Sequence, residues 1–176
     1  NQAIFTSGWE RPFDMEPFPL SINCRNTRQI AERISATGHG EVDEHLVAGL
    51  SGSVSSKKAS SRRSVVEAVI QGVRELRDQF DFGPDELTVL ASSRALVSEL
   101  LVSDSKQFSE TPDKGQVLVE TIHRFKGLEN QGILLALDPE TNNEDVDRLG
   151  YGGMSRAQQV LRVIASKGDL QALFWD

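Results

Sequence analysis

An α/β fold with helices on both faces of a mostly parallel sheet is predicted by two features of the sequence. Short apolar runs recur along the chain, each bounded by turn-forming residues, at 87–91, 116–120, 132–137 and 160–165. Runs of this length without polar alternation are typical of strands that are buried on both faces. Helical stretches separate these runs, and strands that alternate with helices favour parallel pairing.

The length and composition are those of a single soluble domain. A chain of 176 residues is long enough to bury a sizeable core. Its 38% hydrophobic and 26% charged residues place it among ordinary globular proteins rather than disordered or fibrous ones. The formal net charge is −7, so any contact with nucleic acid has to be local. Acidic residues gather at 41–44 and 140–147, where we expect solvated loops.

Cysteine usage and hydropathy indicate a cytoplasmic protein without a membrane partner. The single cysteine, Cys24, cannot form an internal disulfide, and three histidines without a second cysteine do not favour a structural zinc site. No stretch approaches the roughly 20 apolar residues that span a bilayer, and no signal peptide opens the chain. The chain lacks an initiator Met, so we expect it to begin inside a longer polypeptide.

The first third of the chain is predicted to hold a connector, one strand-helix unit and a polar excursion. Residues 1–19 combine aromatic residues with three prolines, which favours an extended connector. A short strand is expected at 20–23, followed by a helix from about Asn26, which could cap it, to Ser35. Residues 37–62 carry little apolar periodicity, and we interpret them as a surface excursion.

The most secure helix is predicted at 64–80. Its apolar residues recur at helical spacing, with charged residues on the opposite face. Gly83 and Pro84 end this helix, and the apolar run 87–91 follows. Ser92 or Ser93 is expected to cap the next helix.

Three clusters of polar residues lie beside predicted strand ends, where open α/β sheets bind their ligands. Arg25 follows the first strand, and its guanidinium could bind a phosphate or form a salt bridge with a neighbouring acid. Thr121, His123, Arg124 and Lys126 offer several donors to a phosphodiester backbone, and nearby Gly127 permits close backbone approach. The third cluster surrounds Arg156, which we place on a helix that leads into the last strand behind three glycines.

Taken in this order, the clusters resemble the second half of the UvrD/Rep-like helicases of superfamily 1, over nearly the whole chain. Asn23-Cys24-Arg25-Asn26 resembles motif IV of that family (Asn-Tyr-Arg-Ser), with Cys24 in place of the family's tyrosine. The segment 121–129, Thr-Ile-His-Arg-Phe-Lys-Gly-Leu-Glu, resembles motif V (Thr-x-His-x-x-Lys-Gly-Leu-Glu) and is the most specific match. The segment 151–157 resembles motif VI (Tyr-Val-Gly-x-Thr-Arg-Ala), and residues 1–5 resemble the tail of motif III.

The resemblance implies a RecA-like second motor domain over residues 20–176, preceded at 1–19 by the end of motif III and a connector. It implies that Arg25 and Arg156 act as arginine fingers on ATP, that Gln2 reads the γ-phosphate and that Glu129 contacts the ribose. It implies single-stranded DNA contacts with the nucleic-acid residues Phe5, Trp9, Thr121, His123 and Lys126. Trp9 lies farther from Gln2 than the family's tryptophan usually does.

The same resemblance implies that ATP and Mg²⁺ are bound mainly by a first motor domain of the same polypeptide. No Gly-x-x-x-x-Gly-Lys-Ser/Thr phosphate loop occurs in this sequence. The implied activity is ATP-dependent movement along single-stranded or partly duplex DNA, in the 3′ to 5′ direction. The fragment alone is expected to be inactive. The family often inserts an accessory domain after motif IV, whereas this chain has only residues 37–62 there.

Two other functions stay open at the level of sequence. One is a nucleic-acid-binding or regulatory module that keeps the motor fold without turnover, against which the intact Gln2, Arg25 and Arg156 argue. The other is a nuclease, which would need a cluster of metal-binding carboxylates. The acids at 140–147 have the composition of a loop instead.

Overall fold

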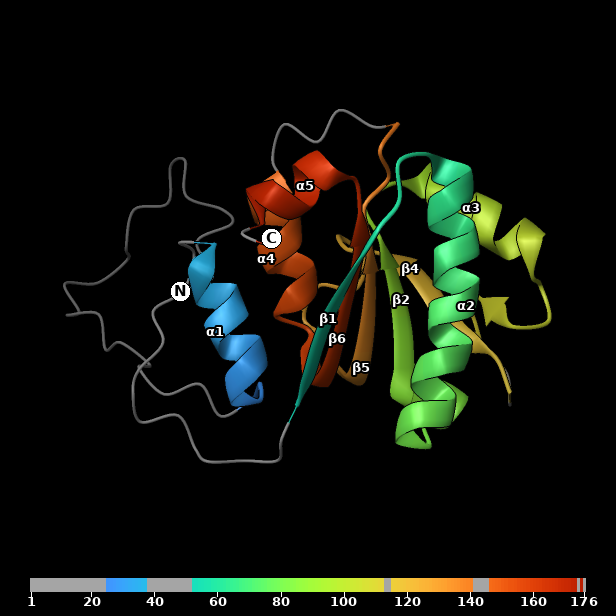
Figure 1. The fold of residues 1–176 in the computed structure, drawn as a ribbon. Coiled ribbons are helices and arrows are strands. Elements are labelled where there is room, and N and C mark those ends of the chain that lie inside the picture. Colours follow the sequence, from blue (N-terminus) through green and yellow to red (C-terminus); the bar gives the residue numbers. More distant parts are fainter. Residues whose placement is uncertain (1–24, 38–51, 113–114, 141–145, 174, 176) are drawn as a thin grey trace, which may run out of the picture.

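A six-stranded parallel sheet lies between two layers of helices in the computed structural model, which confirms the predicted α/β class (Figure 1). The structure describes residues 25–37, 52–112, 115–140, 146–173 and 175. The strands are β1 (Ser53–Lys58), β2 (Leu87–Ala91), β3 (Phe108–Ser109), β4 (Val117–Thr121), β5 (Asn130–Ala136) and β6 (Ala157–Ala165). The helices are α1 (Arg28–Ala36), α2 (Arg62–Phe80), the short 3-10 helix η1 (Pro84–Glu86), α3 (Arg94–Ser103), α4 (Val146–Met154) and α5 (Lys167–Ala172).

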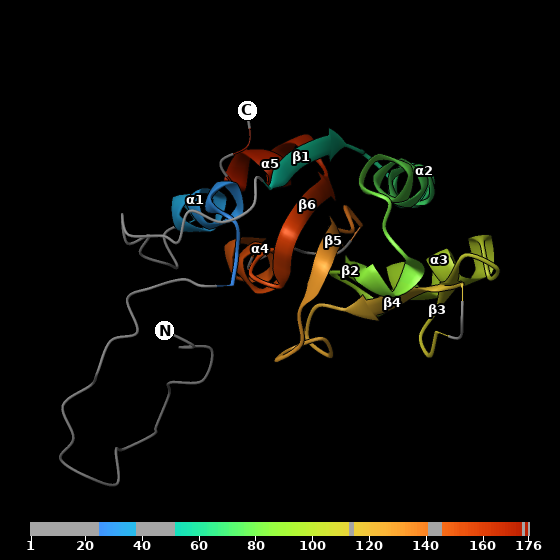
Figure 2. The ribbon, with the colours of Figure 1, turned by 90° about the horizontal axis from the view of Figure 1, so that it is seen from below.

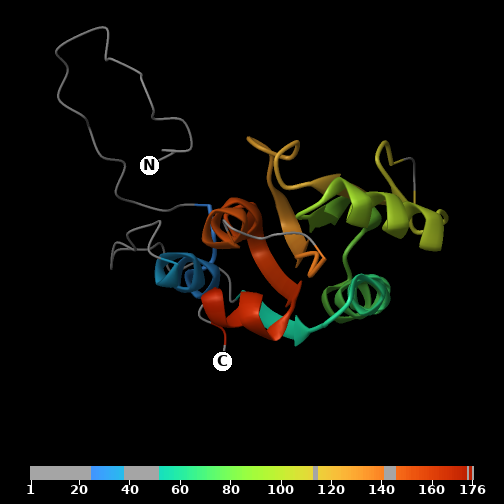
Figure 3. The same cartoon turned by 90° about the horizontal axis from the view of Figure 1, so that it is seen from above.

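The sheet has the strand order β1-β6-β5-β2-β4-β3, and every pairing is parallel. At its centre Val89 of β2 is in register with Val119 of β4 and with Leu134 of β5. All five residues of β2 are buried, because helices cover this strand on both faces. Parallel strands place all their amino ends at one edge of the sheet, which faces the viewer in Figure 2, and all their carboxyl ends at the other, which faces the viewer in Figure 3.

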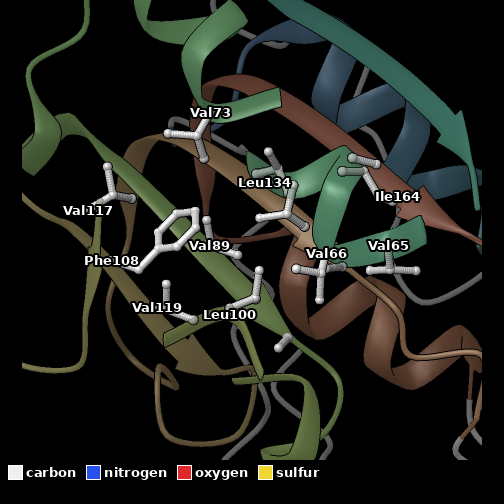
Figure 4. Packing of buried hydrophobic residues seen from close by; sticks show 14 of the residues in the cluster. Val65, Val66, Val73, Val89, Leu100, Phe108, Val117, Val119, Leu134 and Ile164 are labelled. Carbon is white, nitrogen blue, oxygen red and sulfur yellow. The ribbon is translucent and has the colours of Figure 1, made fainter. Parts of the chain in front are cut away.

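Helices α2 and α3 cover one face of the sheet and enclose the larger core (Figure 4). Phe108, Val73 and Leu134 are fully or almost fully buried there. Helix α2 begins with a capping box in which the hydroxyl of Ser61 accepts from the Ser64 backbone at 3.2 Å, while the Ser61 backbone donates to the Ser64 hydroxyl at 3.0 Å. The prediction of a helix at 64–80 is confirmed with two extra residues at its start, and Ser93 caps α3 as predicted.

Helices α1, α4 and α5 cover the opposite face, together with the segment that joins β4 to β5. Ile122 and Phe125 of that segment are buried in the same core as Ile30 of α1 and Met154 of α4. This layer carries the segments that resemble motifs IV, V and VI. Packing on one face of the sheet therefore brings together three segments that lie far apart in the sequence.

The prediction of a polar excursion at 37–62 is wrong for its second half. Strand β1 occupies 53–58 at the edge of the sheet and pairs with β6, where Ser55 is in register with Arg162. Its side chains are half-buried or exposed, since an edge strand has only one neighbour. The apolar periodicity that marks the buried strands is therefore missing from β1, although its backbone hydrogen bonds are made.

Three smaller differences from the sequence prediction concern helix and strand boundaries. Asn26 does not cap α1, because its side-chain amide donates to the Ala157 carbonyl instead, and Thr27 occupies the cap position. Strand β3 and helix α5 were not predicted, because each is short. The expected strand at 20–23 and the connector at 1–19 lie outside the described residues. Among the described residues, no helix combines the length and the apolar character that a membrane span requires.

Candidate nucleotide and nucleic-acid site

Arg25, Glu129 and Arg156 lie together at the amino edge of the sheet. Glu129 directly precedes β5 and Arg156 directly precedes β6, so both stand beside neighbouring strand ends. Nε of Arg25 lies 2.5 Å from Oε2 of Glu129. The salt bridge to a neighbouring acid, one of the two interpretations of Arg25 from sequence, is therefore present, and it joins two predicted site residues.

Arg156 lies in the turn between α4 and β6, and not on the helix where the sequence placed it, and backbone carbonyls at the end of α4 hold it there. Its side-chain Nε donates to the Gly152 carbonyl at 3.1 Å, and its backbone N–H donates to the Gly153 carbonyl at 3.1 Å. Its own carbonyl accepts from the backbone of Asn130 at 3.1 Å. Only 7% of the residue is exposed, so the guanidinium is fixed in direction before any ligand binds.

The position of Arg156 depends on close packing between α4 and β5. A Cβ atom at Gly153 would lie 2.5 Å from Cδ1 of Leu135, nearer than carbon atoms approach without overlap. Glycine therefore lets the helix approach the strand at this point. This agrees with the prediction that glycines permit tight packing before Arg156.

The electrostatic environment of Arg156 favours an anion. Burial lowers the pKa of this guanidinium, and the positive charge of Arg25 lowers it further, while Tyr151 and Glu129 act in the opposite direction. Two guanidinium groups thus lie near the carboxylate of Glu129, which forms an ion pair with Arg25. A polyanion such as a nucleotide's phosphate chain would offset the repulsion between the arginines.

Hydrogen bonds join the three segments into one unit. The Asn26 side chain donates to the carbonyls of Ala157 and Ser155, the latter at 3.5 Å, and the Thr27 backbone donates to the Gln158 carbonyl at 3.0 Å. The side chain of Gln158 donates in turn to Oε1 of Glu129 at 2.8 Å. These hydrogen bonds therefore join the backbone segments that carry Arg25, Glu129 and Arg156.

A shallow hollow of about 260 Å³ opens beside Glu129 at the same edge of the sheet. Its walls are mostly apolar and include Leu87, Leu118, Phe125 and Leu128. The side chain of Leu128 is one of two large hydrophobic residues that the described part of the chain exposes. The surface next to the charged cluster is consequently apolar.

Thr121, His123 and Lys126 lie in the connection from β4 to β5, which begins at the opposite, carboxyl edge of the sheet. Thr121 is the last residue of β4, and its hydroxyl accepts from the Arg124 backbone at 3.4 Å. The side chains of His123 and Lys126 are exposed. Gly127 adopts a φ of 87°, a conformation that L side chains rarely take, and it redirects the chain toward Glu129. The predicted site residues therefore fall into two groups, one at each edge. The expectation that all clusters follow strand ends, where α/β sheets bind ligands, is wrong for Glu129 and Arg156, because each precedes its strand.

Two polar clusters at the carboxyl edge were not predicted from the sequence. Asp138, which follows β5, is fully buried and accepts from Arg62 Nη2 at 3.0 Å and from the Ser93 hydroxyl at 2.5 Å. The second cluster joins Glu110 to two arginines, Arg94 and Arg124. The positions of Asp138 and Arg94 just after buried strands are the signals that could have identified them.

Gln2, Phe5 and Trp9, which complete the predicted site, lie outside the described residues. Cys24, at the position of the family's motif IV tyrosine, also lies outside them. Within the ranges that the structure describes, no group of three or more His, Cys, Asp and Glu residues could hold a metal ion.

No protein-family model and no curated protein matches this sequence. Solved structures share its fold. The C-terminal domain of a possible DNA helicase from Lactobacillus plantarum WCFS1 superposes with a TM-score of 0.57 at 20% identity, over 81% of this chain and 86% of that one. This chain therefore shares the fold of that domain.

Two viral structures show weaker similarity. Arterivirus nonstructural protein 10, a helicase, matches 88% of this chain with a TM-score of 0.46 at 15% identity. The PRRSV helicase matches 87% with a TM-score of 0.47 at 14% identity. This chain spans 27% and 24% of the lengths of those proteins.

Proposed function

We propose that this chain is the second motor half of an ATP-dependent translocase or helicase that moves along single-stranded DNA in the 3′ to 5′ direction. The observation that carries the proposal is the cluster of Arg25, Glu129 and Arg156 at one edge of the sheet. The fold similarity to a helicase C-terminal domain supports it. The resemblance of the three segments to motifs IV, V and VI supports it independently of the fold.

Arg25 and Arg156 are proposed to face the γ-phosphate of ATP across a cleft. Transfer of the phosphoryl group concentrates negative charge on its oxygens, and a prearranged guanidinium stabilises that charge. The burial of Arg156 and its hydrogen bond to Gly152 reduce the reorganisation needed at that moment. The phosphate-binding loop and the acids that hold Mg²⁺ are proposed to belong to a first motor domain of the same polypeptide.

Glu129 is proposed to contact the ribose. Its carboxylate accepts from Arg25 and from Gln158, and about two fifths of the side chain is exposed. It could therefore accept a hydroxyl without leaving its protein partners. Gln2, by the resemblance alone, is proposed to sense the γ-phosphate.

Thr121, His123 and Lys126 are proposed to contact the DNA backbone, with Phe5 and Trp9 stacking on bases. The connection that carries the first three residues ends at Glu129 and is anchored by buried Ile122 and Phe125. A shift of Glu129 on nucleotide binding would therefore be transmitted along a short, packed segment toward the DNA contacts. This gives a physical route for coupling hydrolysis to movement.

The test is DNA-stimulated ATP hydrolysis by the full-length protein with Arg156→Ala and Arg25→Ala. We expect either substitution to lower kcat by roughly 10³ to 10⁵, the contribution of an arginine finger, while ATP binding is largely kept. Arg74→Ala is the matched control, because Arg74 is an exposed arginine of α2 that pairs with Asp104 away from the cluster. Each variant is first checked for folding by circular dichroism.

The absence of turnover by wild type with any single strand would overturn the motor proposal. In that case a binding or regulatory module with the same fold would replace it. Turnover that survives both substitutions would overturn the arginine-finger roles alone.

A further inference from the structure

Glu110 lies between two arginines on the surface of the carboxyl edge, away from the cluster of Arg25, Glu129 and Arg156. Both terminal nitrogens of Arg94 donate to its carboxylate, one to each oxygen, and the Nη2 to Oε2 distance is 2.8 Å. Nη1 of Arg124 lies 3.7 Å from the same carboxylate and 3.3 Å from Oε2 of Glu120. One carboxylate is thus shared by two guanidinium groups.

This arrangement has the geometry of an arginine-phosphate contact. The planar guanidinium binds carboxylate and phosphate oxygens with the same paired donors. The hydrogen bond from Arg94 lowers the pKa of Glu110, burial opposes this, and the charges of Arg94 and Arg124 lower it further. Glu110 is therefore ionised at neutral pH and fills a site that would suit another anion.

The network adjoins the connection that carries Thr121 and His123. Arg94 is the first residue of α3, which follows β2, and Arg124 lies three residues after the end of β4. The Ile122 backbone donates to the Ala91 carbonyl at 3.1 Å, so the ends of these two adjacent strands are in direct contact. In the view from above the strands, the start of α3 lies beside this part of the sheet (Figure 3).

We propose that Arg94 and Arg124 bind a backbone phosphate of single-stranded DNA, and that the carboxylate of Glu110 is an internal competitor for this site. The inference rests on the proposed function, because the DNA strand involved is the one that Thr121 and His123 are proposed to contact. It adds two binding residues and a competitor that the resemblance does not supply. DNA enters by displacing Glu110 from the arginines.

Exposure makes this displacement feasible. The side chains of Arg94 and Arg124 are 54% and 67% exposed, so their ion pairs are strongly screened by water and salt. Glu120 is only 11% exposed and keeps its contact with Arg124 when Glu110 leaves, which holds this guanidinium in place. The competitor also keeps the two arginines from attracting other polyanions while no DNA is bound.

The test measures binding of a fluorescein-labelled 20-nucleotide oligo(dT) to the full-length protein by anisotropy, between about 50 and 200 mM salt. Glu110→Gln is expected to tighten binding roughly two- to fivefold at the low end, the scale of exposed ion pairs. Arg94→Ala and Arg124→Ala are each expected to weaken binding, and removal of both arginines is expected to reduce the salt slope by about 0.7, the value for one lost phosphate contact. In a variant that lacks both arginines, Glu110→Gln should change the affinity for oligo(dT) only by the effect of its net charge.

Glu32→Gln is the matched control. It makes the same change in net charge and breaks a similarly exposed ion pair, with Arg28, on α1. If Glu110→Gln increased the affinity for oligo(dT) no more than Glu32→Gln did, and if the salt slopes of the arginine variants equalled that of wild type, this inference would be overturned. The proposed function would still stand. If neither wild type nor any variant bound oligo(dT), both would be overturned.

Discussion

Nε of Arg25 lies 2.5 Å from Oε2 of Glu129, which joins the residues ahead of α1 to the residue ahead of β5. The other carboxylate oxygen of Glu129 accepts from Gln158, one residue into β6. This one carboxylate therefore connects all three segments that resemble helicase motifs. The two side chains are about half exposed, so this ion pair adds little to the free energy of unfolding and acts mainly by positioning Arg25 and Glu129.

Glu129→Gln is expected to raise the KM for ATP by roughly ten- to a hundredfold, the loss of one hydrogen bond to a charged group. The free energy of unfolding should change by less than about 1 kcal/mol, because the ion pair is exposed. Steady-state kinetics of the full-length protein and urea denaturation measure the two effects. Glu32→Gln, which breaks the exposed pair with Arg28, should leave the KM unchanged. An equal KM in the Glu129 variant and wild type would remove Glu129 from the site.

Arg62→Ala is expected to destabilise the domain by about 3–5 kcal/mol. Asp138 is fully buried, and removing Arg62 takes an ion pair of 3.0 Å away from its carboxylate. Arg63→Ala is the control, because the neighbouring Arg63 forms only an exposed pair with Glu67 and should cost less than about 1 kcal/mol. Chemical denaturation measures both. Similar losses in the two variants would contradict the structural role of the buried pair.

Gly153→Ala is expected to cost about 1–3 kcal/mol, the usual effect of overpacking. The added Cβ would lie 2.5 Å from Leu135, so α4 would have to move away from β5 and shift Arg156 with it. Because of that shift, DNA-stimulated ATP hydrolysis should fall as well. Gly168→Ala in α5 is the control, since its nearest neighbour lies 3.9 Å away, and thermal unfolding should detect no loss of stability. Wild-type stability in Gly153→Ala would show that α4 tolerates the methyl group.

Glu110→Gln is expected to lower the stability of the domain at neutral pH and to have no effect in acid. The pKa of Glu110 is lowered in the folded protein, so its carboxylate stabilises the fold above the ordinary glutamate value of roughly 4.3. That contribution is lost as the pH falls through the lower folded-state pKa. Denaturation of wild type and variant between neutral and acid pH measures the difference. A difference that grew toward acid pH would contradict the assigned ion pairs.

Local patterns were sufficient for much of the fold. Helix α2 and strands β2, β4, β5 and β6 were predicted because burial imposes apolar spacing on each of them. Strand β1 was not predicted, since it is held at the edge by backbone hydrogen bonds to β6 and its polar side chains carry no periodicity. The prediction that Asn26 caps α1 is wrong, because its side-chain amide donates instead to the carbonyl of Ala157 in β6.

The sequence by itself determined the fold class and the order of the segments around Arg25, Thr121 and Arg156. Buried strands appear as short apolar runs, and each of these segments is recognised from residues that are close together in the sequence. Only the tertiary structure decided which of these residues meet. Packing of α1, α4 and β5 against one another brings Arg25, Glu129 and Arg156 to the amino edge, whereas Thr121 ends a strand at the opposite edge. The pairing of Glu110 with Arg94 and Arg124 arises in the same way, since contacts between distant segments are set by the sheet order and leave no local pattern.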